Sequence, residues 1–305
     1  MRPIFSWFWH DVLKRPYRLA CPIDVGEGVP VVLLHGVATS SATWSGTVEA
    51  LGKVPVRVLG FDLLGFGVSP KPERSSYDVK AHAAAVAQTI WRLHIRQPVV
   101  LVGHSMGCLI AVELAKAHPK LVRKMILYEA PLYEGLPARR RYNLRRDLYY
   151  AMYRRIVKHP HYSPANVRAL QKIVVRAMGF VDVSRETWNA FVRSLRNTIM
   201  AQTALNDLRQ LKTPTELIYG SRDIVVIRGK PQNFFGADAQ HITAHTIAET
   251  HGISPKAATF LAGRVGTAIG LSEAEVVSRL PNYKRYLKSP KTKIFLARSR
   301  RKKHD

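Results

Sequence analysis

Cysteines are scarce in this 305-residue sequence, which contains only Cys21 and Cys108. Neither has a partner at C-x-x-C spacing, so neither a disulfide framework nor a cysteine-based metal site is expected. The scarcity favours a reducing, cytoplasmic location. Cys108 has small, apolar neighbours, and we expect it to be a buried free thiol.

Long apolar runs are also missing, because no segment approaches the roughly 20 apolar residues that span a bilayer. The aromatic stretch 1–13 is interrupted by His10 and Asp11, and no small-residue cleavage site follows it, which argues against a signal peptide. We expect a short helix whose aromatic side chains dock on the core. The alternative is insertion into a membrane interface, with Lys14 and Arg15 near the headgroups.

Acidic residues are few: the sequence has 21 Asp and Glu but 47 Lys and Arg, which gives a net charge of +26. Much of the excess lies in residues 139–209 and 284–303. Such a charge indicates attraction to polyanions and carries no information about fold. Peripheral contact with an anionic membrane surface is left open. Specific nucleic-acid binding is not expected, because no recognised motif or interleaved aromatic residues accompany the basic tail.

Short apolar runs recur along the chain, and several of them end in Gly or Asp. They occupy residues 30–35, 54–61, 98–102, 124–127, 215–219 and 241–247. Runs of this kind are typical of strands buried on both faces. Helical spacing of apolar residues separates them, at 79–94, 105–117 and 255–265. The alternation predicts an α/β fold with a mostly parallel central sheet flanked by helices.

One stretch, 132–209, has no convincing buried strand and carries amphipathic helical patterns instead. We expect it to be a helical insertion between two strands of the sheet. The predicted organisation is an N-terminal helical or extended segment at 1–24, a core at 25–131 and 210–270, the insertion at 132–209, and a basic C-terminal extension at 271–305. The length suits one large domain with such an insertion.

The pentapeptide Gly103-His104-Ser105-Met106-Gly107 follows a predicted strand and opens a predicted helix. This is the context of a G-x-S-x-G nucleophile elbow, in which a sharp turn presents the serine hydroxyl above the sheet. Small residues are needed where such a turn packs closely against its neighbours. We therefore predict that Ser105 is a nucleophile.

A serine hydroxyl needs a base, and three histidines lie in the right part of the chain. His241 and His245 fall within the last predicted strand, where a structural or surface role is favoured. His251 lies in the loop after that strand, from which a base can reach the nucleophile. We therefore predict that His251 is the base, with His245 as the rival.

The base needs a carboxylate that fixes its tautomer and stabilises its cation. Asp223 comes just after a predicted strand, in Tyr219-Gly220-Ser221-Arg222-Asp223. Glu129, at the end of an earlier strand, is the alternative acid. Asp223 is preferred, because it gives the chain order Ser, Asp, His.

Two backbone amides are needed for the oxyanion of a tetrahedral intermediate. Met106, directly after the nucleophile, supplies the first amide. The loop after the first buried strand supplies the second, most simply from Val37. We expect His35, in the same loop, to brace it by hydrogen bonding.

Taken in order, these motifs resemble landmarks of the α/β-hydrolase superfamily. The resemblance rests on Leu34-His35-Gly36, residues 61–69, the Ser105 pentapeptide, Tyr219 to Asp223, and His251. It implies the α/β-hydrolase fold, with the 132–209 insertion as a helical cap. It also implies an acyl-enzyme mechanism that needs no cofactor and no metal. The aspartate nucleophile of haloalkane dehalogenases and epoxide hydrolases is replaced here by Ser105, which disfavours those reactions.

The expected activity is that of a serine hydrolase acting on a small-molecule acyl ester, similar to esterases and acylglycerol lipases. Lactonases, thioesterases, carbon–carbon bond hydrolases and haloperoxidase-like enzymes share the pattern and stay open. A non-catalytic scaffold that binds an anionic partner is the alternative of another class. The tyrosines and arginines of the cap are candidates for the substrate pocket, although packing and a solvated face explain them equally well.

Overall fold

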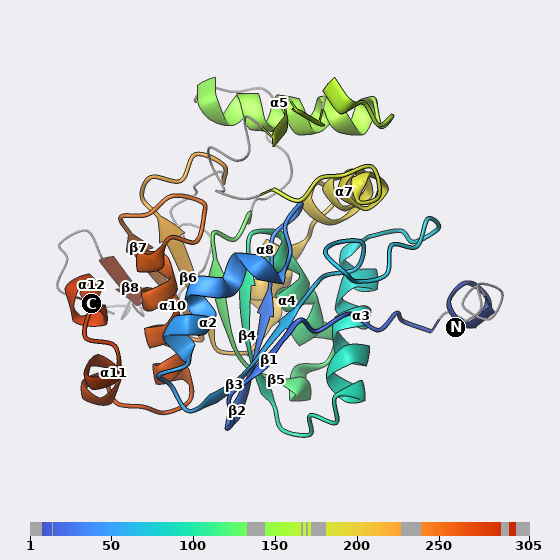
Figure 1. The fold of residues 1–305 in the computed structure, drawn as a ribbon. Helices are drawn as coiled ribbons and strands as arrows, with labels where there is room; N and C mark the ends of the chain where they lie inside the picture. The colour runs from blue at the N-terminus through green and yellow to red at the C-terminus, as the bar shows by residue number, and fades with distance from the viewer. Residues whose placement is uncertain are drawn as a thin grey trace, which may run out of the picture.

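A twisted sheet of eight strands forms the centre of the protein in the computed structural model (Figure 1). The structure describes residues 8–13, 15–132, 144–165, 167–168, 170–171, 181–226, 239–287 and 293–296. The strand order is β1-β3-β2-β4-β5-β6-β7-β8. Strands β2 to β7 run parallel to one another, and the edge strands β1 and β8 pair antiparallel with their neighbours.

The six predicted apolar runs all form parallel strands, which confirms the α/β fold class. The strands are β1 Ile23–Val25, β2 Val29–Leu34, β3 Val56–Phe61, β4 Val99–His104, β5 Val122–Tyr128, β6 Thr215–Gly220, β7 Ile242–Ile247 and β8 Lys293–Leu296. Every residue of β4 is buried, as expected for a central strand covered on both faces. The edge strands β1 and β8 have only three and four residues, and the sequence analysis missed both.

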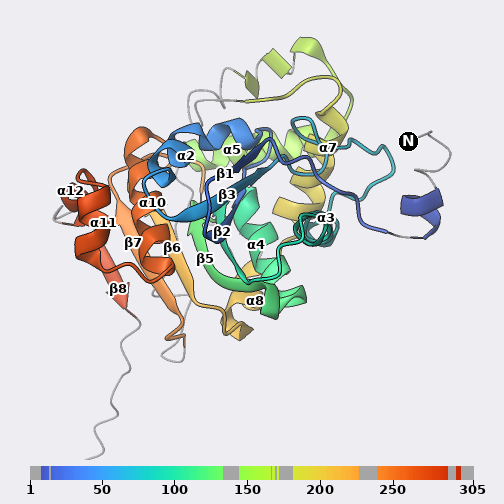
Figure 2. The same ribbon diagram turned by 60° about the horizontal axis from the view of Figure 1, so that its bottom comes forward.

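Helices cover both faces of the sheet (Figures 1 and 2). One face packs against α3 Val79–Arg92, α4 Met106–Ala117 and α8 Ala204–Gln210. The other packs against α2 Ser45–Leu51, α10 Pro255–Ala268, α11 Glu273–Arg279 and α12 Tyr283–Leu287. Short 3-10 turns occur at Ser41–Trp44 (η2) and Pro119–Leu121 (η3). Two apolar cores result, one on each side of the sheet.

Between β5 and α8 the chain leaves the sheet and forms helices at the top of Figure 1. They are α5 Leu144–Lys158, α7 Trp188–Ser194 and the π-helical turn η4 Leu195–Ile199. Side chains of α7 and η4 hold the loop after β3: Arg193 donates to the Ser75 carbonyl and Asn197 to the Ser76 carbonyl. The amide of Asp182 donates to the Ala38 carbonyl in the loop after β2. The insertion is therefore anchored on loops that follow the carboxyl ends of the strands.

The N-terminal segment differs from its expected packing. Residues Phe8–Val12 form a π-helical turn, η1, but Phe8 is 46% exposed and Trp9 is 37% exposed. Docking of these aromatic side chains on the core is therefore wrong. Arg15 instead lies over the Trp9 ring, 4.8 Å from its centroid. The aromatic residues before Phe8 lie outside the described residues.

The C-terminal part of the chain adds to the fold. Tyr283 of α12 is fully buried beside α10, and β8 extends the sheet by pairing with β7. The basic run 298–303 lies outside the described residues, so the division of the chain at residue 270 stays a prediction. No helix in the described ranges is long and apolar enough to cross a membrane.

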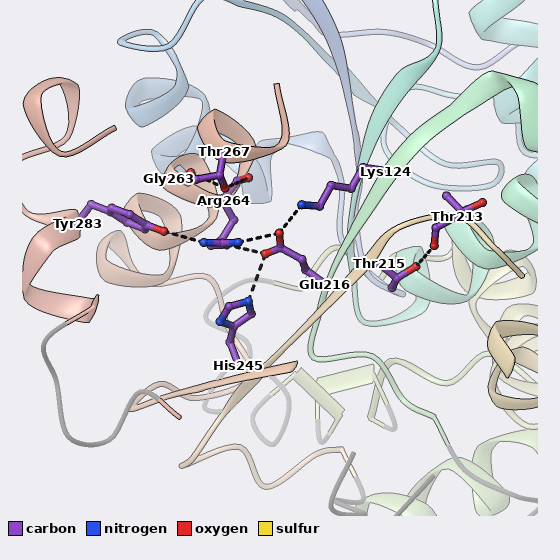
Figure 3. A network of polar contacts seen from close by, with 9 residues as sticks. All are labelled: Lys124, Thr213, Thr215, Glu216, His245, Gly263, Arg264, Thr267 and Tyr283. Carbon is purple, nitrogen blue, oxygen red and sulfur yellow. Dashed lines mark hydrogen bonds and ion pairs between the residues drawn. The ribbon is translucent and has the colours of Figure 1, made fainter. Parts of the chain in front are cut away.

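A buried charged network joins α10 and α12 to the sheet (Figure 3). Glu216 of β6 accepts two hydrogen bonds from Arg264 of α10, at 2.5 and 2.8 Å, and forms an ion pair with Lys124 of β5 at 2.5 Å. Arg264 also donates to the Tyr283 hydroxyl at 3.2 Å, and His245 of β7 lies 3.3 Å from Glu216. Burial raises the pKa of Glu216, but the bonds from His245 and Arg264 and the nearby positive charges outweigh it and hold the pKa well below its usual range.

Candidate active site

Ser105 lies in the sharp turn between β4 and α4, as predicted. Its backbone has φ 51° and ψ −117°, a left-handed φ that costs free energy for a residue with a side chain. A Cβ on Gly107 would lie 2.1 Å from the Leu34 carbonyl oxygen, and one on Gly103 would lie 2.8 Å from the Cys108 amide nitrogen. The turn can therefore form only with glycine at both positions.

The predicted oxyanion loop runs directly beside this turn. A Cβ on Gly36 would lie 3.3 Å from the Cβ of Ser105, so the loop after β2 passes the nucleophile at contact distance. Val37 follows Gly36 and is buried, and Ala38 has a positive φ of 58°. Met106 is the first residue of α4, where an amide has no acceptor within its own helix. Both predicted amide donors thus belong to segments that flank Ser105.

His251 and Asp223 are joined by a buried hydrogen bond. His251 Nδ1 lies 2.8 Å from Asp223 Oδ2, and the other oxygen of Asp223 accepts from the amides of Val225 and Val226, at 2.6 and 3.2 Å. Burial raises the pKa of Asp223, but the charge of His251 and the hydrogen bonds to the carboxylate outweigh it and hold the pKa well below its usual range. The carboxylate is therefore ionised, and the proton of His251 is on Nδ1. The other ring nitrogen, Nε2, is buried and has no hydrogen-bond partner in the described part of the chain.

Two residues that the sequence analysis did not single out hold the His251 loop. The Tyr128 hydroxyl, at the end of β5, donates to the carbonyls of Thr250 and Gly252 at 2.8 and 3.1 Å. Burial, with a smaller effect of His251, lowers the pKa of His104 to about 3, so its ring is neutral at pH 7. Its Nε2 lies 2.8 Å from the His251 carbonyl, which can only accept, so His104 is the donor. The residue before Ser105 therefore anchors the loop that carries the predicted base.

Comparisons with known proteins agree with the fold described above. The sequence profile of the alpha/beta hydrolase fold matches residues 29–163, which include Ser105. The structure resembles an esterase from Thermogutta terrifontis, with a TM-score of 0.57 at 21% identity over 82% of this chain and 91% of that one. It also resembles an epoxide hydrolase, with a TM-score of 0.59 at 17% identity over 83% and 98% of the two chains. The chain therefore has the α/β-hydrolase fold, and the family profile matches its residues 29–163.

Among curated proteins, this chain is similar to a protein of Arabidopsis thaliana named probable lysophospholipase BODYGUARD 4. The two are 39% identical over 124 residues, which is 40% of this chain and 28% of that protein. An uncharacterized protein of Mycobacterium tuberculosis is 37% identical over 117 residues, 38% of this chain and 32% of that protein. The matches thus span at most about a third of the length of these relatives.

Glu129 lies next to the pair formed by Asp223 and His251. It directly follows β5 and has a φ of 53°; it is fully buried, and its Oε1 accepts a hydrogen bond from the Gly220 amide. One potential ligand atom from each of Glu129, Asp223 and His251 lies within 4.8 Å of the others, so this is the place in the described chain where a metal ion could be held. His251 Nδ1 is bonded to Asp223 rather than to Glu129. The geometry therefore favours Asp223 as the partner of the base.

Two polar residues near the site support the surrounding loops. The Leu63 amide donates to His35 Nε2 at 2.8 Å, so His35 carries its proton on Nδ1 and donates to the Gly36 carbonyl at 2.7 Å. Burial lowers the pKa of His35 to about 4, which keeps the ring neutral. Asp62 accepts from the amides of Ser41 and Val68, both at 2.8 Å. These bonds agree with the predicted bracing role of His35 and show that Asp62 also holds the loops beside it.

Other residues considered from the sequence have structural roles or lie outside the described residues. His245, the predicted rival of His251, belongs instead to the Glu216 network (Figure 3). Trp188 and Phe191 of α7 are buried in the main core cluster, so packing explains them. Tyr133 and the arginines at 139–141 lie outside the described residues. Cys108 is a buried free thiol, as expected.

Proposed function

We propose that this α/β hydrolase is a serine hydrolase that cleaves carboxylic esters, with Ser105, His251 and Asp223 as its catalytic residues. The proposal rests most directly on the buried hydrogen bond between His251 Nδ1 and Asp223. That bond fixes the tautomer in which Nε2 can accept a proton. The Nε2 atom is buried and unbonded, and the strained turn of Ser105 lies beside the same loops.

In the proposed reaction the Ser105 oxygen attacks the ester carbonyl while His251 Nε2 takes the hydroxyl proton. The amides of Val37 and Met106 donate to the oxyanion of the tetrahedral intermediate. His251 then gives the proton to the departing alcohol, leaving an acyl-Ser105 ester. Water attacks this ester with His251 again as the base, which releases the acid and restores the serine. Asp223 stays ionised throughout and stabilises the imidazolium.

The ester of a monoacyl glycerophospholipid is the substrate we propose to test first. This choice is supported by the relatives named probable lysophospholipases, with which the chain shares up to 39% identity. The matched region covers 28% of that protein, so its name guides the choice of the first substrate to test and does not assign the substrate of this chain. Lactones, thioesters and substrates with a cleavable carbon–carbon bond are the competing classes on this fold.

Hydrolysis of p-nitrophenyl acyl esters of increasing chain length tests the proposal. We expect measurable turnover with at least one ester, and a fall in kcat of about 10⁶-fold in Ser105→Ala, as for removal of a serine nucleophile elsewhere. The matched control is Ser278→Ala, which removes an exposed hydroxyl on α11 and should leave kcat unchanged. Equal rates in the wild-type protein and Ser105→Ala would contradict the proposal and favour the scaffold alternative.

A further inference from the structure

A strongly basic pocket lies between the last turns of α5 and η4, in the cap. Its volume is about 480 Å³. The lining residues come from two elements far apart in sequence. They are Arg154, Arg155, Val157, Lys158, His159, Arg196 and Met200. Four of these seven side chains carry a positive charge at pH 7, and none is acidic.

Three positive side chains of this pocket, Arg155, Lys158 and Arg196, have no nearby acidic partner in the described part of the chain. The sequence has no Asp or Glu between Asp147 and Asp182. In the ranges that the structure describes, no carboxylate pairs with Arg155, Lys158 or Arg196. The carboxyl end of helix α5 contributes roughly half a negative elementary charge. This is too little to balance the positive charges of Arg155, Lys158 and Arg196. An anionic ligand would provide the missing charge.

The walls of the pocket are held in place by hydrogen bonds. Arg196 Nη2 donates to the Val157 carbonyl at 2.9 Å, which ties η4 to the end of α5. The Trp188 indole donates to the Pro160 carbonyl at 2.6 Å, and the Trp188 ring is buried. The exposed side chains of Arg155 and Lys158 therefore start from a fixed backbone, so a ligand has to order these side chains but not the backbone.

The chemistry of the lining favours a phosphate group. Guanidinium groups match the oxygens of phosphate with paired hydrogen bonds, and an ammonium group adds a point charge. Val157 and Met200 place apolar surface in the same pocket, which suits a phosphate ester with a short carbon chain better than a bare ion. We propose that this pocket binds the phosphate group of a glycerol phosphate, presented either by a phospholipid headgroup or by a soluble ester.

Binding to the full chain with the Ser105→Ala substitution tests this proposal separately from catalysis. Titration calorimetry with glycerol 3-phosphate covers the soluble source, at about 150 mM salt to screen weak surface attraction. Sedimentation with vesicles of phosphatidylcholine, with and without phosphatidylglycerol, covers the headgroup. We expect saturable binding in at least one arm, and the arm that binds identifies the source.

The variant Arg155→Gln/Lys158→Gln removes two charges from the pocket. The matched control Arg123→Gln/Lys120→Gln removes two charges from exposed positions near the start of β5. We expect affinity to fall by about tenfold or more in the first variant, because two charge-assisted contacts are lost, and to stay unchanged in the control. Thermal unfolding verifies that both variants are folded. Binding in neither arm, or an equal loss of affinity in the two variants, would overturn the proposal.

Discussion

Asp223 and Glu129 show how two neighbouring buried carboxyl groups take different roles. Asp223 accepts hydrogen bonds from one imidazole and two amides, all of which stabilise its charged form. A hydrogen bond from Glu129 also lowers the pKa of Asp223. Glu129, by contrast, accepts a hydrogen bond from the Gly220 amide and not from the imidazole of His251. The triad therefore depends on which carboxyl group faces His251.

Substitution of the two acids separates these roles. We expect Asp223→Asn to lower kcat by about 10⁴-fold, because an amide at this position favours the wrong tautomer of the base. Glu129→Gln keeps a hydrogen-bond donor and acceptor of nearly the same shape, and we expect it to lower kcat by less than about tenfold. Ester turnover at neutral pH provides the measurement. Inactivation by Glu129→Gln alone would reverse the assignment.

At the scale of elements, the elbow depends on close contact between β4, α4 and the neighbouring β2. Gly107 packs against the Leu34 carbonyl with no room for a methyl group. Gly103 allows the turn to close on the first residues of α4. The glycines of the pentapeptide therefore maintain backbone contacts, which is a structural requirement separate from the chemistry of the serine.

Substitution of Gly107 by alanine tests this packing. We expect Gly107→Ala to lower the free energy of unfolding by about 3 kcal/mol, because the methyl group would overlap the Leu34 carbonyl and force the two elements apart. The matched control is Gly46→Ala on the exposed start of α2, where the nearest atom would lie 3.7 Å from the added carbon. The control should be neutral or slightly stabilising, since alanine favours a helix. Equal denaturation midpoints for the two variants would refute the packing argument.

Across the whole molecule, the Glu216 network connects the sheet with two helices that cover it. Glu216 is nearly completely buried and is surrounded by groups from β5, β7 and α10 (Figure 3). Removal of one partner from a buried ionic cluster leaves the others uncompensated. The network is thus expected to contribute to stability in a pH-dependent way.

We expect Glu216→Gln to lower the free energy of unfolding by about 3 kcal/mol at pH 7. The folded-state pKa of Glu216 lies below its unfolded value, so its contribution is complete above the unfolded pKa of about 4.3 and is lost as the pH falls below it. The gap between wild type and variant should therefore shrink in acid. Urea unfolding at pH 7 and in acid measures it, with the exposed Glu49→Gln as the control. A gap that is independent of pH would contradict the ionised state of Glu216.

Much of this architecture could be predicted from the sequence, for identifiable physical reasons. Strands β2 to β7 are covered on both faces, so their sequences are continuous apolar runs that stand out from the helices. Strands β1 and β8 have one strand neighbour each, and residues such as Asp24 and Lys293 give no such signal. Exposure of Phe8 was not predictable, because an aromatic residue near a chain end gives the same pattern whether it packs on the core or faces solvent.

The residues of the candidate site could be predicted from local motifs and their order along the chain. The hydrogen bonds that hold the His251 loop could not be predicted, because they join residues far apart in sequence. His104 bonds the His251 carbonyl across 147 positions, and Tyr128 bonds the Thr250 carbonyl across 122. The histidine directly before Ser105 was a visible signal, but its partner was not. Only the parallel register that brings β4 and β5 together places both side chains beside the base.

The central claim is that Ser105 is an activated nucleophile, and a fluorophosphonate probe tests it most directly. The probe forms a stable bond with a serine whose proton is removed by a neighbouring base. We expect mass spectrometry of the labelled full chain to place one adduct on Ser105. The adduct should be missing from His251→Gln and from wild-type protein unfolded before labelling. Folded wild-type protein without a Ser105 adduct, or with the label on another serine, would contradict the account.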